Sequence, residues 1–216
     1  MKILGIIITC VVGSIILILS ISRVPGAHLP AYRYTFERQN VTVEDFNAEG
    51  YILDIGGGGE GVIGQLKGQQ VIAVDISKRE LEEAPPGPLK IIMDARDLKF
   101  LDDSFNTATV FFAFMYIDGL DHKEVFQELS RVLKPGGRLL IWDVIFPGQT
   151  DRRKEIALFP LTIHLPAKVI ETGYGSRWPK KGRGLSHYIR LARDTGFKVI
   201  THKEKERWFF LELKKI

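Results

Sequence analysis

The sequence predicts an α/β fold: a doubly wound, seven-stranded, mostly parallel sheet with an antiparallel C-terminal hairpin, plus one N-terminal transmembrane helix. Three observations support this. Short apolar runs alternate with helix-like segments from Tyr51 onward, two strand-like runs close the chain, and residues 3–21 carry no charge. We therefore expect an anchor in residues 1–24, a juxtamembrane linker in residues 25–49 and one domain in residues 50–216.

The N-terminal run is long enough to cross a bilayer once. Its nineteen residues, rich in Ile, Leu and Val, would span about 28 Å as a helix, close to the roughly 30 Å hydrocarbon core. A cleaved signal peptide is the alternative, because Lys2 precedes the run and Ser20-Ile21-Ser22 resembles a cleavage site. The run exceeds the usual apolar stretch of about 7 to 15 residues, which favours the anchor. Tyr32, Tyr34 and Phe36 of the linker either sit at the membrane interface or pack against the domain.

The helices and strands of the domain are predicted from the spacing of apolar residues and from the glycines and prolines that end each segment. After Ile145 the pattern loosens. We expect strands at Tyr51–Ile55, Val71–Asp75, Leu89–Met93, Ala108–Phe114 and Arg138–Asp143, helices at Val62–Lys67, Lys78–Glu83, His122–Leu133 and Ser186–Asp194, a helix within Arg152–Leu165, an irregular Gly- and Lys-rich Ile170–Arg183, and a hairpin of Phe197–His202 and Arg207–Leu213.

The charge is distributed unevenly along the chain. Residues 40–150 hold 10 Lys and Arg against 18 Asp and Glu, whereas residues 151–216 hold 16 against 7, and the whole chain is at +4. A basic C-terminal part beside an anchor could meet anionic lipids or an anionic substrate, or be a solvated face without a partner. No nucleic-acid-binding signature is present, and the single Cys10 excludes an intrachain disulfide or a cysteine-based metal site.

A glycine-rich turn follows the first strand of the domain. The stretch Asp54-Ile55-Gly56-Gly57-Gly58-Gly59-Glu60-Gly61 leads directly into a helix, and glycines let such a turn approach a ligand closely. Asp75 and Asp94 end the next two strands. Since the carboxyl ends of adjacent parallel strands share one sheet edge, where open α/β sheets bind ligands, the sequence predicts a nucleoside site there.

These motifs resemble those of class I S-adenosylmethionine-dependent methyltransferases, which have a Rossmann-like fold and a first motif of hydrophobic-Asp-x-Gly-x-Gly-x-Gly. Here Glu60 replaces the last glycine. The segments 71–77, 94–98 and 133–140 resemble the later motifs of the family, so the resemblance covers roughly residues 50–146. It implies S-adenosylmethionine as the cofactor, bound by Asp54, Gly56, Gly57, Gly58, Asp75, Ile76, Asp94, Ala95 and Phe112.

Nicotinamide chemistry is the alternative enzymatic interpretation of the glycine turn. A dinucleotide would place its pyrophosphate at the helix start, where Glu60 would repel it. The methyl donor has no phosphate, so a carboxylate is tolerated there. The chain also lacks the Tyr-x-x-x-Lys pair of short-chain dehydrogenases. A third possibility is a non-catalytic relative of the fold that binds membranes or proteins.

The acceptor site is less defined by the sequence. Methyl transfer needs mainly positioning and a dry pocket, so neither a triad nor a metal site is expected. O- or C-methylation of a small or lipidic, membrane-associated acceptor is favoured, with the domain in the cytoplasm and the oligomeric state open. Catalytic candidates are Tyr116, His122, Tyr174 and His187, further acceptor-site candidates are Asp118, Asp143, His164, Arg177 and Trp178, and Gly173–Pro179 is expected to be a loop that covers the acceptor.

Overall fold

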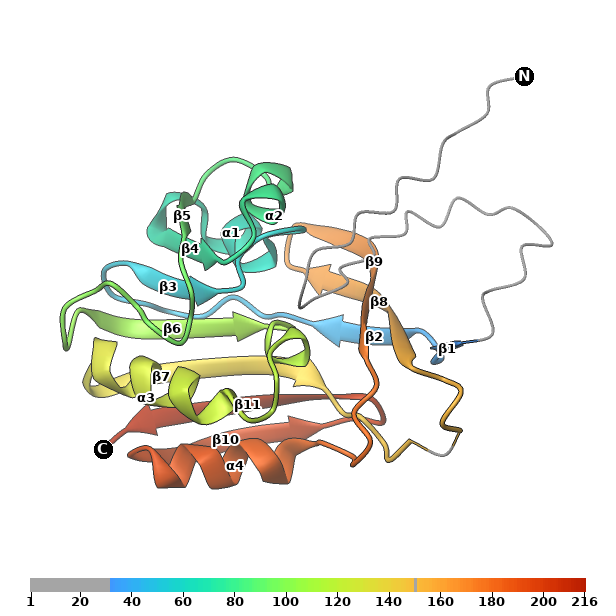
Figure 1. Cartoon of the computed structure of the whole chain (residues 1–216). Helices are drawn as coiled ribbons and strands as arrows, with labels where there is room; N and C mark the ends of the chain where they lie inside the picture. Colours follow the sequence, from blue (N-terminus) through green and yellow to red (C-terminus); the bar gives the residue numbers. More distant parts are fainter. Residues whose placement is uncertain (1–31, 150) are drawn as a thin grey trace, which may run out of the picture.

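The computed structural model describes residues 32–149 and 151–216. Its main element is a seven-stranded sheet, which Figure 1 shows beside the smaller second sheet. The strand order is β10-β11-β7-β6-β3-β4-β5, and β11 runs antiparallel to both neighbours while the other pairs are parallel. The strands are β3 (Ile52–Ile55), β4 (Val71–Asp75), β5 (Leu89–Ile92), β6 (Phe105–Phe111), β7 (Leu133–Val144), β10 (Phe197–Glu204) and β11 (Trp208–Lys215). The predicted mostly parallel sheet with a C-terminal antiparallel hairpin is confirmed.

The helices are short and cover both faces of this sheet. They are α1 (Val62–Lys67), α2 (Lys78–Glu83), α3 (His122–Val132) and α4 (Leu185–Asp194), with 3-10 turns η1 (Gly68–Gln70) and η2 (Phe114–Tyr116). The apolar stripe of α3, Val125, Phe126, Leu129 and Val132, is fully buried. It packs in one cluster with Tyr188 and Ala192 of α4, so α3 and α4 are held on the sheet by the hydrophobic effect of that stripe.

A second sheet of four strands was not expected. It consists of β1 (Arg33–Thr35), β2 (Gln39–Thr42), β8 (Ile156–Leu165) and β9 (Lys168–Arg177). β1 and β2 pair in parallel with β8, and β9 pairs with it antiparallel. The predicted helix within residues 152–165 is therefore wrong, and the region 170–183 is mainly strand rather than irregular.

The sequence of β8 explains why a strand forms there. Ala157, Phe159, Leu161 and Ile163 recur every second residue and are buried, which is the period of a strand with one covered face. Pro160, which has no N–H to donate, lies between the β8 segments that pair with β1 and with β2. A proline is tolerated at this gap because no ladder hydrogen bond is lost.

The described part of the predicted linker packs against the domain. Phe36 is buried and stacks on Phe159 with ring centroids 4.8 Å apart, and its ring meets Trp178 at 5.2 Å. Tyr34 is 43% exposed and touches the same cluster. We expected these aromatics either at the membrane interface or packed against the domain, and Phe36 is packed against the domain. One hydrophobic cluster contains residues of both sheets, so the four-stranded sheet covers the carboxyl edge of the larger one (Figure 1).

The predicted transmembrane run, residues 3–21, lies outside the described residues. Within residues 32–149 and 151–216, the structure contains no helix that is both long and apolar enough to cross a membrane.

Two strand boundaries differ from expectation, each for a local reason. β6 ends at Phe111 because Phe112 adopts a left-handed backbone, with φ of 51°, and the chain then forms η2 instead of continuing to Phe114. β7 begins at Leu133, directly after α3, and its pairing with β6 is interrupted around residues 134–137. Pro135 cannot donate and Gly136 has φ of +78°, so this stretch bulges out of the ladder.

Candidate functional site

The glycine turn between β3 and α1 lies against its neighbours so closely that side chains do not fit. Gly56 and Gly57 donate their N–H groups to the Val74 carbonyl at 2.8 and 3.1 Å. A Cβ on Gly56, whose φ is +70°, would lie 2.4 Å from the Ala113 Cβ, and one on Gly58 would lie 2.5 Å from the Glu80 Cβ. The turn therefore requires glycine, and it brings backbone to the carboxyl edge of β3 and β4.

Asp75 at the end of β4 is held in a fixed orientation beside this turn. Its Oδ1 accepts the Ser77 N–H at 2.8 Å, and the backbone of Gly58 also donates to the carboxylate. Burial raises the pKa of Asp75. The next side chain, Ile76, is 67% exposed, a high fraction for an isoleucine. An oriented carboxylate and an open apolar surface thus stand side by side at this edge.

Asp94 and Ala95 follow β5 at the same edge. The Met93 N–H donates to the Asp75 carbonyl at 2.9 Å, so the two strand ends are adjacent. Arg96 donates to Asp94 from Nε at 3.0 Å and from Nη2 at 2.6 Å, and its hydrogen bonds hold the pKa of Asp94 below the usual value. The guanidinium also binds Asp121 at 2.8 Å. Asp94 therefore remains ionised and points toward Arg96, with lone pairs left for a further donor.

Four carboxyl groups surround the glycine turn without a counter-ion. They belong to Asp54, Glu60, Asp75 and Glu80. Burial raises the pKa of Asp54 to about 7, and Asp75 adds to the effect. Burial, followed by Glu83 and Asp75, raises the pKa of Glu80 to about 6. In the described part of the chain, no Lys, Arg or His forms an ion pair with any of the four, so this edge is electronegative.

Alternate residues of strand β9 contact the glycine turn and the segment that follows β6. Thr172 donates its hydroxyl to the Glu60 carboxylate. The Tyr174 ring lies 5.5 Å from the Phe112 ring, and the Ser176 hydroxyl donates to the Met115 carbonyl at 2.6 Å. The stretch Gly173–Arg177, expected to be a loop, is therefore strand, although it does lie over the site. Trp178 follows it and is buried, donating from Nε1 to the Pro147 carbonyl at 2.9 Å.

The turn after β6 is fixed by a buried acid. Asp143 at the end of β7 accepts the Met115 N–H at 3.2 Å and the Val144 N–H at 2.7 Å. Burial raises the pKa of Asp143 to about 7, although Arg183 opposes that shift. The turn carries Tyr116, which approaches the Gly175 backbone, and burial raises its hydroxyl pKa well above the usual value. Tyr116 and Tyr174 are thus brought together between η2 and β9.

The two histidine candidates, His122 and His187, lie in contact with each other. The Nε2 atom of His122 lies 3.1 Å from both the Phe114 and Ile117 carbonyls, which can only accept, so Nε2 carries the hydrogen. Nδ1 then accepts from Nε2 of His187 at 3.0 Å. Burial lowers the pKa of His122 to about 3 and of His187 to about 4. Both rings are neutral at pH 7, and they tie η2 to α4.

The other candidates lie apart from the glycine turn or act locally. Asp118 is exposed and accepts the Leu120 N–H at 2.9 Å within a turn. His164 of β8 contacts the Asn40 side chain of β2 at 3.0 Å. Arg177 is exposed at the end of β9. These three side chains stabilise loops and strand pairs or face solvent.

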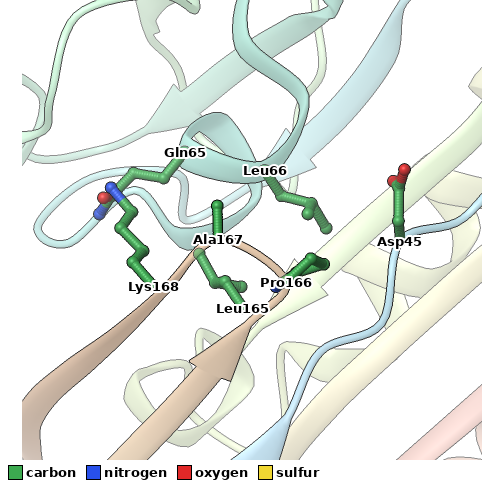
Figure 2. A pocket seen from close by; sticks show the side chains of 7 residues that line it. All are labelled: Asp45, Gln65, Leu66, Leu165, Pro166, Ala167 and Lys168. Atoms are coloured by element: carbon green, nitrogen blue, oxygen red, sulfur yellow. The ribbon is translucent and has the colours of Figure 1, made fainter.

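A surface pocket lies between helix α1 and the β8–β9 turn (Figure 2). It is formed by Asp45, Gln65 and Leu66 on one side and by the β8–β9 turn, Leu165–Lys168, on the other. Its lining contains no strand-end acid and no tyrosine. The carboxylates and the exposed Ile76 at the strand ends define the candidate site, and this pocket is not part of it.

Two residues of the site were missed by sequence reasoning. Glu80 lies three residues after Ser77, and the Glu80 N–H donates to the Ser77 Oγ at 3.3 Å. In the sequence, this spacing indicates only a helix cap. Thr172 is placed on the turn by the β8–β9 register. If Lys168–Arg177 is predicted as a strand, the side chains of Thr172, Tyr174 and Ser176 are expected on one face of it.

Comparison with known proteins agrees with the fold and with the glycine turn. Residues 53–141 match the family described as "Methyltransferase domain". An O-methyltransferase, resE, of Aspergillus sclerotiorum is 28% identical over 69% of this chain and 55% of its own length. A demethylmenaquinone methyltransferase of Clavibacter sepedonicus is 35% identical over 63% of this chain and 60% of its own. The chain thus spans little more than half of these relatives.

The fold is also that of solved methyltransferases. A SAM-dependent methyltransferase from Methanosarcina mazei superposes with a TM-score of 0.57 at 19% identity, covering 79% of this chain and 94% of that one. At this identity the likeness concerns the fold. Taken together, the family match over residues 53–141 and the shared architecture support a class I methyltransferase domain with S-adenosylmethionine as its cofactor.

Proposed function

We propose that this chain transfers a methyl group from S-adenosylmethionine to a small or lipidic acceptor held between the glycine turn and β9. The observation that carries this proposal is the set of carboxyl groups at Asp54, Glu60, Asp75 and Glu80, which have no ion-pair partner among the described residues. S-adenosylmethionine carries a positive sulfonium and a positive ammonium group, and an electronegative edge attracts such a ligand. The same edge would repel the pyrophosphate of a nicotinamide dinucleotide, which argues against a dehydrogenase.

The donor groups at the strand ends fit the adenosyl part of the cofactor. Asp75 is oriented by backbone N–H groups and keeps free lone pairs, so it would accept hydrogen bonds from the two ribose hydroxyls. Ile76 offers exposed apolar surface, which together with Ala95 would contact the adenine ring. The free lone pairs of Asp94 would accept from the adenine amino group. Gly56, Gly57 and Gly58 would let the backbone approach the ligand.

The chain contributes positioning and exclusion of water. When bound, S-adenosylmethionine supplies an electrophilic methyl group on a positively charged sulfur. The hydroxyls of Tyr116 and Tyr174 are protonated at neutral pH, and burial raises their pKa further, so they would orient an acceptor by donating hydrogen bonds. They would not remove its proton. Phe112 and strand β9 shield this region from solvent, which strengthens the electrostatic interactions within it.

The acceptor class is inferred from two sources. The two named relatives are an O-methyltransferase and a demethylmenaquinone methyltransferase, and both names suit a small organic acceptor. The uncharged residues 3–21 suit a single-pass anchor that would confine the domain to the membrane surface, where a lipidic acceptor is concentrated. The proposed arrangement places the domain in the cytoplasm, where the methyl donor is made.

Calorimetric titration of the chain with S-adenosylmethionine tests the proposal. We expect Asp75→Asn to weaken binding by about 10- to 100-fold, since hydrogen bonds to a charged group contribute about 1.5–3 kcal/mol. The matched control is Asp97→Asn, because Asp97 is exposed and its ion pair among the described residues is with Lys99; this variant should bind like wild type. Absence of binding by the wild-type chain would instead favour a non-catalytic membrane or protein-binding module.

If the cofactor binds, the acceptor can be sought directly. Lipid and quinone extracts from a deletion strain should contain species lighter by one methyl group, and the purified chain should convert them with S-adenosylmethionine. Unchanged extracts, together with bound cofactor, would mean that the acceptor class is wrong and not the cofactor.

A further inference from the structure

A cluster of basic side chains lies at one end of the four-stranded sheet. We call it the basic end and define it as Arg33, Arg152, Lys154, Arg177, Lys180 and Lys181. The strand register places its parts together: Arg33 of β1 is opposite Ile156 of β8, and Ile156 is opposite Arg177 of β9. Arg152 and Lys154 precede β8, and Lys180 and Lys181 follow β9. Three separate chain segments therefore contribute positive charge to one surface.

Backbone hydrogen bonds hold these segments side by side. The Glu155 N–H donates to the Tyr32 carbonyl at 2.8 Å, and the Trp178 N–H donates to the Glu155 carbonyl at 2.7 Å. Farther along, Phe146 and Arg183 exchange backbone hydrogen bonds at 2.8 and 2.9 Å. The loop before β8 and the loop after β9 are thus fixed against each other and against the start of β1, so the surface is preformed.

Within the described residues, the positive charges of the basic end outnumber the acids of the same segment, Asp151 and Glu155. Over residues 32–149 and 151–216, no carboxylate forms an ion pair with any of its six members. The neighbouring Arg153 does bind Asp151, at 3.1 Å. Arg152, Arg177, Lys180 and Lys181 are exposed, while Arg33 and Lys154 are partly so. Unpaired, clustered positive charge on a preformed surface predicts an anionic partner.

The position of this surface in the chain favours a bilayer as the anionic partner. Tyr32 and Tyr34, 44% and 43% exposed, stand beside Arg33, and exposed tyrosines beside basic residues are typical of membrane interfaces. Only ten residues separate Ile21, the end of the uncharged run, from Tyr32. Those residues can span at most about 36 Å. If residues 3–21 enter a bilayer, the basic end is held close to its surface.

We propose that the basic end binds the anionic headgroups of the bilayer and thereby orients the domain, with β9 and the carboxyl edge of the large sheet next to the membrane. Each Lys or Arg near an anionic surface raises the docked-to-free ratio about fivefold, and salt weakens the effect. The six unpaired groups are enough to dock the domain even though the chain as a whole carries only +4. This proposal does not depend on methyl transfer.

Lysine labelling of the full-length chain in nanodiscs tests it. An amine-reactive reagent and mass spectrometry report the accessibility of Lys154, Lys180 and Lys181, with Lys198 of β10 as the distant reference. We expect labelling of the three lysines to fall several-fold in phosphatidylcholine–phosphatidylglycerol discs relative to phosphatidylcholine discs, and the protection to disappear in high salt. Labelling of Lys198 should not change. Equal labelling of the three lysines in both lipids would overturn the proposal.

Charge reversal separates local docking from net charge. Arg152→Glu/Arg177→Glu should abolish the protection, because losing two basic groups alone lowers the docked-to-free ratio about 25-fold. The matched control is Lys134→Glu/Lys214→Glu, two exposed lysines near the amino end of β7, which changes the net charge equally and should preserve protection. Equal loss in both variants would reject a defined surface. Protection by DNA but not by anionic discs would reject lipid as the partner.

Discussion

Asp54→Asn is expected to remove a pH dependence of folding that the buried carboxyl imposes on the wild-type chain. Asp54 is 2% exposed, and its Oδ1 accepts the Thr109 hydroxyl at 2.7 Å. Burial raises its pKa from 3.8 to about 7. The folded state therefore retains a proton over a pH range in which the unfolded chain has already lost it.

The sign and the magnitude follow from this difference. Between about pH 4 and about pH 7 the folded state binds more protons, so stability decreases as the pH rises, by up to about 1.4 kcal/mol per unit. Over the whole range the loss from this one group is about 4 kcal/mol. Asparagine can still accept the Thr109 hydrogen bond and does not ionise. The variant should thus match wild type near pH 4 and be more stable above pH 7.

Urea unfolding at several pH values measures this effect. The three tryptophans, Trp142, Trp178 and Trp208, are all buried, so their fluorescence reports unfolding. Because Asp143 and the histidines are present in both proteins, the difference between the two stability curves reports Asp54 together with its coupling to Asp75. Parallel curves from pH 4 to pH 8 would refute the reasoning, since they would mean that the carboxyl is ionised in the folded state at no cost.

Three further substitutions test the site and the packing around it. Gly58→Ala would place a methyl group 2.5 Å from the Glu80 Cβ and should lower the unfolding free energy, measured by urea titration, by about 1–3 kcal/mol. The control is Gly148→Ala, where a methyl group has space, and its unfolding free energy should stay within about 0.5 kcal/mol of wild type. Glu60→Gln should weaken S-adenosylmethionine binding about tenfold, or about 1.4 kcal/mol, in calorimetry, with unchanged affinity contradicting the electrostatic argument. Trp178→Ala should lower the unfolding free energy by about 3–5 kcal/mol and leave the affinity for S-adenosylmethionine unchanged. A loss of that affinity without a loss of stability would instead place Trp178 in the cofactor site.

Much of the large sheet could be predicted because its signals are local. Each strand of the parallel part is a short apolar run, and the glycine turn and Asp75 follow directly from their places at strand ends. The predicted strand boundaries were wrong where the backbone conformation of a single residue ends the strand, as at Phe112. A left-handed backbone at a phenylalanine is held by tertiary contacts and leaves no mark in the sequence pattern.

The four-stranded sheet was not predicted because its pairing is distant. β1 and β8 lie more than a hundred residues apart, and β1 has three residues, too few for a periodic signal. Pro160 and the glycines of β9 further argue against strands by composition. Only the alternation of Ala157, Phe159, Leu161 and Ile163 reveals the strand, and it requires reading that segment at a period of two rather than 3.6.

The two charged regions of the protein come from different parts of the chain, which makes their proposed roles separable. The carboxylates around the glycine turn belong to residues 40–150, where acids exceed bases by 8, and most of the basic end belongs to residues 151–216, where bases exceed acids by 9. A cationic ligand at the first region and an anionic surface at the second would each be favoured without opposing the other. Reversing Arg152 and Arg177 should consequently leave S-adenosylmethionine affinity in solution intact, and Asp75→Asn should leave lysine protection in anionic nanodiscs intact. If either variant impaired both properties, the basic end and the cofactor edge would have to be parts of one site.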